Sequence, residues 1–210
     1  MTTRVVFWGM RAGESDGRGL TTLGIQQVEE AASVALARER VRLTAIRRGA
    51  ERDAWHAGRQ TKRVLGQFNV EQVVADELGG PSCPSMSCEV CRQIIESTPR
   101  VGRPVTVAEW LHYDRHAPTR RTQALILLER LAEEQQQLQS PNVLLIESSY
   151  SHPVIELAVP DEYAGRFPRL AHGDMVRYDT TWSEEAGFKI TEIAYIRSRL
   201  SSDRTAAASV

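Results

Sequence analysis

The sequence predicts an α/β fold in which a mostly parallel central sheet has helices on both faces. Short apolar runs rich in β-branched residues alternate with longer segments of helical periodicity. This alternation is typical of parallel strands joined by right-handed helical crossovers. The length of 210 residues suits one domain of this class with a small insertion.

The alternation is clearest in the first third of the chain. Thr21 and Thr22 are candidate N-caps, because a threonine side chain can accept a hydrogen bond from the first turn of a helix. The predicted elements here are a strand at 4–8, a helix from about 21 to 38, a strand at 43–46 and a helix at 56–68.

A segment rich in proline and glycine, at about 76–118, interrupts the alternation. We expect it to be an insertion over the sheet edge, with a helix at 89–96. The remaining predicted elements are a helix at 121–138, a strand at 143–148, a turn and short helix at 150–159, a hairpin of 175–182 with 188–196, and a flexible tail at 198–210. Residues 1–200 then form a single domain.

Bulk composition argues against several classes of partner. The 26 basic and 27 acidic side chains nearly cancel, so we expect neither nucleic acid nor a membrane as partner. The longest apolar runs have the length of strands, and the start of the chain lacks the pattern of a secretory signal. We therefore expect a cytoplasmic protein without a cofactor.

Three cysteines lie within the expected insertion. Cys83, Cys88 and Cys91 could hold a tetrahedral zinc ion together with a downstream imidazole, His112 or His116. The alternative, which we favour, is three reduced cysteines in a loop, because such spacings often occur without a metal.

Polar side chains gather where the predicted strands end. Ligands of open α/β sheets bind at the carboxyl ends of the strands, and several guanidinium groups there would suit a phosphate. The residues expected at this edge are Arg11, Gly13, Glu14 and Ser15 after the first strand, Arg47, Arg48, Arg52 and Arg59 after the second, and Ser148, Ser149, Ser151 and His152 after the strand at 143–148.

Two of these stretches resemble the histidine phosphatase (phosphoglycerate mutase-like) superfamily. Residues 11–14 read Arg-Ala-Gly-Glu where the family has Arg-His-Gly-Glu, and Leu-Thr-x-x-Gly-x-x-Gln follows at 20–27. The segment "VLLIESSYSHPVIELAV" resembles a strand of the family with the Ser-His turn and the helix that follow it. The resemblance implies a phosphate site in which Arg11 is the first arginine, His152 is the second histidine, and Gly13, Ser15 and Ser151 contact phosphate.

The sequence departs from the family pattern at two places. Ala12 stands where the family has the histidine that attacks phosphorus, and alanine has no lone pair. The position of the second arginine holds Ala57, so Arg52 or Arg59 would have to replace it. The acid that protonates the leaving group has no clear counterpart, although Glu77 and Glu109 are candidates.

These departures leave several functions open. We favour a degenerate member that binds a phosphorylated small molecule, peptide or protein with little or no turnover. A second hypothesis is a phosphomonoesterase or phosphohistidine phosphatase in which an engineered alanine replaces the histidine at position 12. A third is an enzyme with a different nucleophile, such as His152 or His56, and a fourth is a regulatory protein-interaction module.

Overall fold

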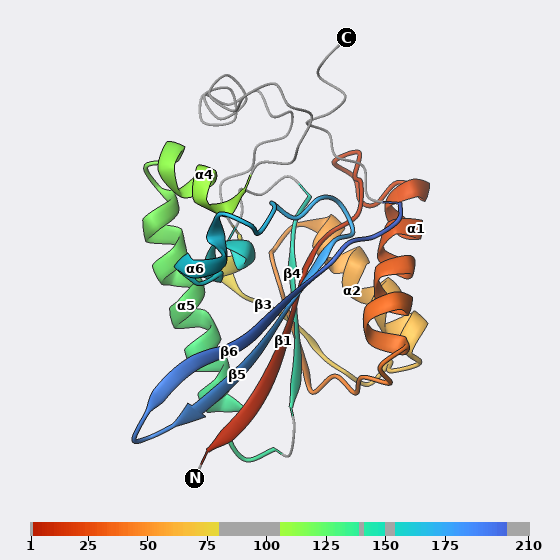
Figure 1. Ribbon diagram of the computed structural model, residues 1–210. Coiled ribbons are helices and arrows are strands. Elements are labelled where there is room, and N and C mark those ends of the chain that lie inside the picture. Colours follow the sequence, from red (N-terminus) through yellow and green to blue (C-terminus); the bar gives the residue numbers. More distant parts are fainter. Residues whose placement is uncertain (1, 80–105, 139–140, 150–153, 201–210) are drawn as a thin grey trace.

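The computed structural model describes residues 2–79, 106–138, 141–149 and 154–200. They form a six-stranded sheet between two layers of helices, as Figure 1 shows. The strands are β1 (Thr3–Arg11), β2 (Ala45–Arg48), β3 (Gln72–Val74), β4 (Asn142–Glu147), β5 (Met175–Ser183) and β6 (Gly187–Ile196).

The strand order is β3-β2-β4-β1-β5-β6. The β3–β2, β2–β4 and β4–β1 pairs are parallel, whereas β5 and β6 add an antiparallel hairpin beside β1. The carboxyl ends of the parallel strands therefore meet at one edge of the sheet, which we call the carboxyl edge. The predicted fold class, a mostly parallel sheet with helices on both faces, is confirmed.

The helices form two layers because the central strands are apolar on both faces. Along β1, Val5 and Phe7 join the core on one face, while Trp8 and Met10 join the core on the other. One layer consists of α1 (Thr22–Ala31), the π-helical η1 (Ala32–Ala37) and α2 (Arg52–Leu65). The other contains α4 (Val107–Tyr113), α5 (Ala117–Glu134), α6 (Asp161–Ala164) and the 3-10 turns η2 (Asp76–Leu78) and η3 (Ile155–Ala158).

Several predicted boundaries were wrong. The second strand lies at 45–48 rather than 43–46, so Arg47 and Arg48 belong to the strand and not to the turn after it. The helix predicted at 56–68 begins at Arg52 and ends before Gly66, whose φ of 65° is left-handed. The helix predicted at 121–138 spans 117–134.

Part of the segment expected to be an insertion contributes to the core. Trp110 on α4 is 1% exposed and packs in the same core cluster as Phe7 of β1 and Leu128 of α5. The predicted helix at 89–96 lies outside the described residues. The predicted tail begins later than residue 198, because Ser198 N–H donates to Asp174 and Leu200 N–H donates to Glu30.

Arg40 adopts an unusual backbone conformation after η1. Its N–H bonds to Ala37 O and the N–H of Val41 bonds to Leu36 O, which together make a Schellman motif. Arg40 takes the left-handed position of this motif with φ 56°. Glycine is the usual residue there, and a side chain with a Cβ costs roughly 1 kcal/mol.

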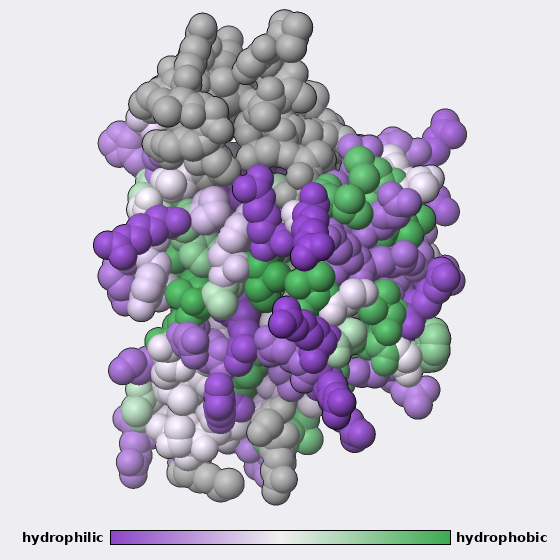
Figure 2. Space-filling model, turned by 45° about the vertical axis from the view of Figure 1, so that its right-hand side comes forward, coloured by the Kyte–Doolittle hydropathy of each residue, from purple (hydrophilic) through white to green (hydrophobic). Residues whose placement is uncertain are grey.

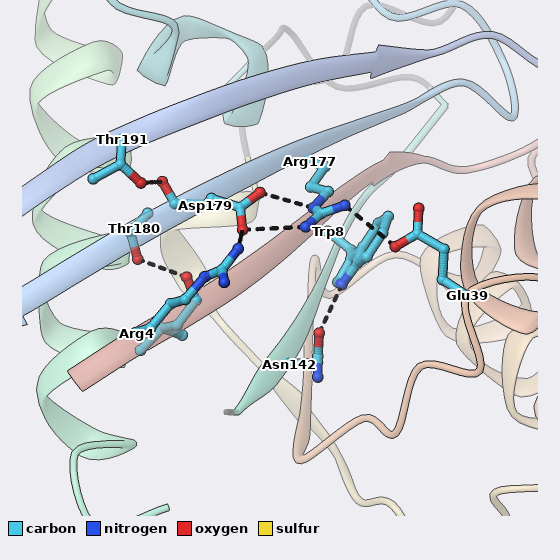
Figure 3. A network of polar contacts seen from close by, with 9 residues as sticks. Arg4, Trp8, Glu39, Asn142, Arg177, Asp179, Thr180 and Thr191 are labelled. Carbon is cyan, nitrogen blue, oxygen red and sulfur yellow. Dashed lines mark hydrogen bonds and ion pairs between the residues drawn. The ribbon is translucent and has the colours of Figure 1, made fainter. Parts of the chain in front are cut away.

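A polar network links the start of the sheet to the end of η1, as Figure 3 shows. Arg177 on β5 lies over the Trp8 ring and forms ion pairs with Asp179 and Glu39. The Trp8 indole N–H donates to Asn142 at the start of β4. Figure 2 shows separate apolar patches between hydrophilic side chains on the face that carries α1 and α2.

Candidate functional site

Ala12 lies at the carboxyl edge, immediately after β1. The strand register pairs Arg11 with Glu147, and the N–H of Ala12 bonds to Glu147 O at 2.9 Å. Ala12 is fully buried and packs in the same core cluster as Ala54 and Ala57 of α2. The position that follows β1 therefore has no side chain able to act as a nucleophile or to bind an anion.

The turn after Ala12 packs directly on the start of α1. A Cβ on Gly13 would lie 2.1 Å from Gly24 O, and a Cβ on Gly24 would lie 2.0 Å from Glu14 O. Thr21 caps α1 as predicted, accepting from the N–H of Gly24 at 3.0 Å. Gly13 and Gly24 therefore allow the backbone of the turn to contact the backbone of α1.

Asp53 binds the polar groups that follow β4. Its Oδ2 accepts hydrogen bonds from Ser148 Oγ at 3.0 Å, Ser149 N at 2.8 Å and Ser149 Oγ at 2.6 Å. Oδ1 accepts from the N–H of Ala54, and the Asp53 side chain is buried. A carboxylate of the protein itself therefore binds the donors of Ser148 and Ser149, two residues expected at this edge.

Arg11 is the centre of a buried cluster of charges. Its Nη2 donates to Ser149 O at 2.8 Å, and the carboxyl groups of Glu147, Glu156 and Asp53 act on it electrostatically. Burial, and then the charge of Arg169, lower the pKa of Arg11 to about 10. Such a lowered pKa still leaves the guanidinium group charged at neutral pH.

The two glutamates of this cluster hold their protons unusually tightly. Burial, and then the neighbouring Glu156, raise the pKa of Glu147 to about 8, although its Oε1 accepts the N–H groups of Val154 and Ile155 at 2.6 Å each. Burial also raises the pKa of Glu156 to about 7, against the opposing charges of Arg11 and Arg169. A substantial share of these carboxyl groups is therefore neutral at pH 7.

A basic stripe runs along α2 beside the turn. Arg52, His56 and Arg59 are spaced i, i+4 and i+7, so they share one helix face. His56 Nδ1 accepts the N–H of Leu20 at 3.4 Å, and Arg59 lies 4.9 Å from the Trp55 ring centre. Burial and the charges of Arg52 and Arg59 lower the pKa of His56. His56 lies in the second turn of α2 and not at its start as predicted.

The other predicted site residues fall into three groups. Ser15 is buried and accepts the N–H of Gly17 at 3.2 Å, so it stabilises the turn. Glu109 accepts from Thr106 in a capping box, and Glu77 pairs with Arg130 at 2.8 Å, which gives both carboxylates structural partners. Ser151, His152, Cys83, Cys88 and Cys91 lie outside the described residues.

His112 is an exposed residue of α4 whose ring meets the Tyr113 ring edge-on. In the part of the chain that the structure describes, no group of three or more His, Cys, Asp or Glu side chains could hold a metal ion. The zinc hypothesis therefore stays a prediction that depends on the three cysteines.

Sequence reasoning missed Asp53, Glu147, Glu156 and Arg169. One signal was visible for Glu147, because a carboxylate that ends a buried apolar strand needs a partner. No pattern in the sequence connects Asp53 to Ser149, 96 positions away. At the carboxyl edge, Asp53 and Glu147 accept hydrogen bonds from the turn after β4, and Glu156 forms an ion pair with Arg169 at 3.7 Å.

Comparison with solved structures identifies the fold. A phosphoglycerate mutase from Bacillus anthracis superposes with a TM-score of 0.60 at 8% identity, covering 91% of this chain and 93% of that one. The chain has the phosphoglycerate mutase-like fold. A mycobacterial glucosyl-3-phosphoglycerate phosphatase superposes with a TM-score of 0.58 at 16% identity, covering 95% of this chain and 100% of that one. The α-ribazole phosphatase of Shigella flexneri superposes with a TM-score of 0.53 at 15% identity, covering 93% of this chain and 97% of that one.

Sequence comparison adds no closer relative, since neither a protein-family model nor a curated protein sequence matches the chain. These structural neighbours are mutases and phosphatases of the phosphoglycerate mutase-like group, and at such low identities they establish the fold alone. Within the described residues, no helix is both long and apolar enough to cross a membrane.

Proposed function

We propose that this chain is a degenerate histidine phosphatase that binds a phosphorylated small molecule, peptide or protein at the carboxyl edge, with little or no turnover. The observation that carries this proposal is the buried Ala12 directly after β1. A methyl group cannot attack phosphorus, so the covalent phosphohistidine route is closed.

The basic stripe on α2 supports the binding half of the proposal. Arg52, His56 and Arg59 have no ion pair with any described carboxylate, and they lie at the first turns of α2 beside the turn that follows Ala12. Guanidinium groups donate paired hydrogen bonds to phosphate oxygens, and the amino end of a helix favours an anion. We therefore assign the main ligand contacts to this stripe.

The surroundings of Asp53 and of Arg11 at the carboxyl edge support the second half of the proposal, that turnover is slow or absent. Asp53 already accepts the donors of Ser148 and Ser149, so these groups are not available to a transferring phosphoryl group. Arg11 lies among carboxyl groups and would contact a ligand at full strength only while Glu147 and Glu156 carry protons. Weak stabilisation of the equatorial oxygens would keep any turnover slow.

The binding half is tested by calorimetry with tungstate as a phosphate mimic. Arg52→Gln should weaken tungstate binding about tenfold, since a charge-assisted hydrogen bond contributes roughly 1.5 to 3 kcal/mol. Arg63→Gln removes the same charge from the far end of the same helix and should change binding less than about twofold. Absence of tungstate binding at millimolar concentration would contradict the proposal.

The catalytic half is tested with para-nitrophenyl phosphate. The chain itself should release no nitrophenol above background, and Ala12→His should stay weak because Asp53 still holds the turn after β4. Vigorous hydrolysis by Ala12→His would favour the second hypothesis, an enzyme that an engineered alanine inactivates. Vigorous hydrolysis by the unchanged chain, lost in His56→Ala, would favour a different nucleophile.

A further inference from the structure

Two hollows lie side by side at the opposite edge of the sheet, where β2 and β4 begin. The first has a volume of about 530 Å³ and lies between residues 39–42 and the strand residues Trp8, Asn142 and Arg177. The second has about 810 Å³ and lies between residues 40–43 and residues 64–70. We call the two hollows and the ridge between them the amino-edge surface.

The amino-edge surface carries an excess of positive charge. Arg177 is balanced by Glu39 at 3.2 Å and Asp179 at 2.8 Å, as Figure 3 shows. Arg40 and Arg42 are exposed on the ridge, and within the described residues neither side chain has a hydrogen bond or an ion pair. Two guanidinium groups are therefore left for an external anion.

An aromatic side chain lies beside these cations. Phe68 lines the second hollow and is 67% exposed, a high value for a phenylalanine. Val64, Leu65 and Val70 line the same hollow, so apolar side chains form part of its wall. The surface thus offers both positive charge and an apolar contact.

The backbone at Arg40 indicates that this side chain has a function. Arg40 holds the left-handed position of a Schellman motif, where glycine or asparagine is favoured. Strained residues that persist without a structural benefit are a recognised feature of functional positions. Here the side chain of Arg40 makes no hydrogen bond or ion pair with a described residue, so it is available to a partner.

We propose that the amino-edge surface binds a segment of a partner protein that is acidic and carries an apolar side chain. Carboxylates of the segment would pair with Arg40 and Arg42, and its apolar side chain would cover Phe68. This contact is independent of the ligand proposed for the carboxyl edge. If tungstate fails to bind at the carboxyl edge, the proposal for the amino-edge surface is therefore not contradicted.

The test uses a fluorescein-labelled peptide of about twelve residues in which Asp and Glu alternate with Leu and Phe. Anisotropy should show saturable binding that weakens as NaCl rises from about 50 to about 300 mM. Arg40→Gly should weaken binding about tenfold and at the same time raise the Tm by about 2–4 °C, because it relieves the left-handed strain. Phe68→Ala should also weaken binding without lowering the Tm.

Matched controls separate this site from general charge attraction. Arg38→Gln removes one exposed charge two residues away, outside both hollows, and should change the affinity less than about twofold. A peptide with Asn and Gln in place of the acids should not bind. Equal losses in Arg38→Gln and Arg40→Gly would overturn the proposal. So would tighter binding of a single-stranded oligodeoxythymidine than of the peptide, or no peptide binding at millimolar concentration.

Discussion

Glu147→Gln offers the sharpest test of the buried charge cluster. Glu147 is 1% exposed, and its Oε1 accepts the N–H groups that follow at Val154 and Ile155. A glutamine has nearly the same shape, and its carbonyl oxygen can accept both hydrogen bonds. The substitution therefore removes a titrating group while it leaves the turn after β4 intact.

The direction of the effect follows from proton linkage. The pKa of Glu147 is raised from 4.5 to about 8, so the folded chain keeps a proton that the unfolded chain has lost. The stabilisation is complete below pH 4.5 and is lost as the pH rises towards 8. Each such group lowers the unfolding free energy by about 1.4 kcal/mol per pH unit.

Glu156 adds to the pH dependence of the unfolding free energy until its own carboxyl group has ionised. Its pKa is raised to about 7, so both glutamates contribute between pH 5 and pH 7. The unfolding free energy of the unchanged chain should therefore fall as the pH rises from 5 to 7, and it should fall less steeply in Glu147→Gln, which keeps only the contribution of Glu156.

Urea unfolding followed by circular dichroism, at several pH values from about 5 to about 7, measures both slopes. Glu162→Gln makes the same chemical change on the exposed helix α6 and should leave the slope as it is. If Glu147→Gln keeps the slope of the unchanged chain, the cluster does not hold its protons in the way that we infer.

Two further substitutions test the geometry of the carboxyl edge. Gly24→Ala should cost about 3 kcal/mol or more in unfolding free energy, since the new Cβ would lie 2.0 Å from Glu14 O. Gly165→Ala, where no atom lies within 4 Å, should be nearly neutral, and equal effects in the two variants would contradict the close contact. Asp53→Ala should cost about 3 kcal/mol because the Ser149 donors lose their acceptor in a buried place. A loss below about 1 kcal/mol by urea unfolding would show that these hydrogen bonds contribute little.

The sequence determined the fold class because local patterns encode it. Apolar strands of the right length alternate with helical segments, and the residues 11–14 and 20–27 carry a recognisable turn and helix start. Thr21 as N-cap follows from the same local chemistry. β3 escaped prediction because it has only three residues, Gln72–Val74, and its two valines are exposed rather than buried.

The candidate site depends on contacts that no local pattern contains. The alanine at position 12 was visible in the sequence, because the four-residue motif that residues 11–14 resemble has a histidine there. The hydrogen bonds between Asp53 and Ser149, and the strand register that sets Arg11 beside Glu147, arise only when β1, β4 and α2 meet at one edge. Burial at that meeting point raises the pKa of Glu147, and burial is a property of the assembled layers. The sequence thus specified which groups are present, and the tertiary structure decided which of them find partners within the protein, because partners far apart in the sequence meet only in the assembled layers.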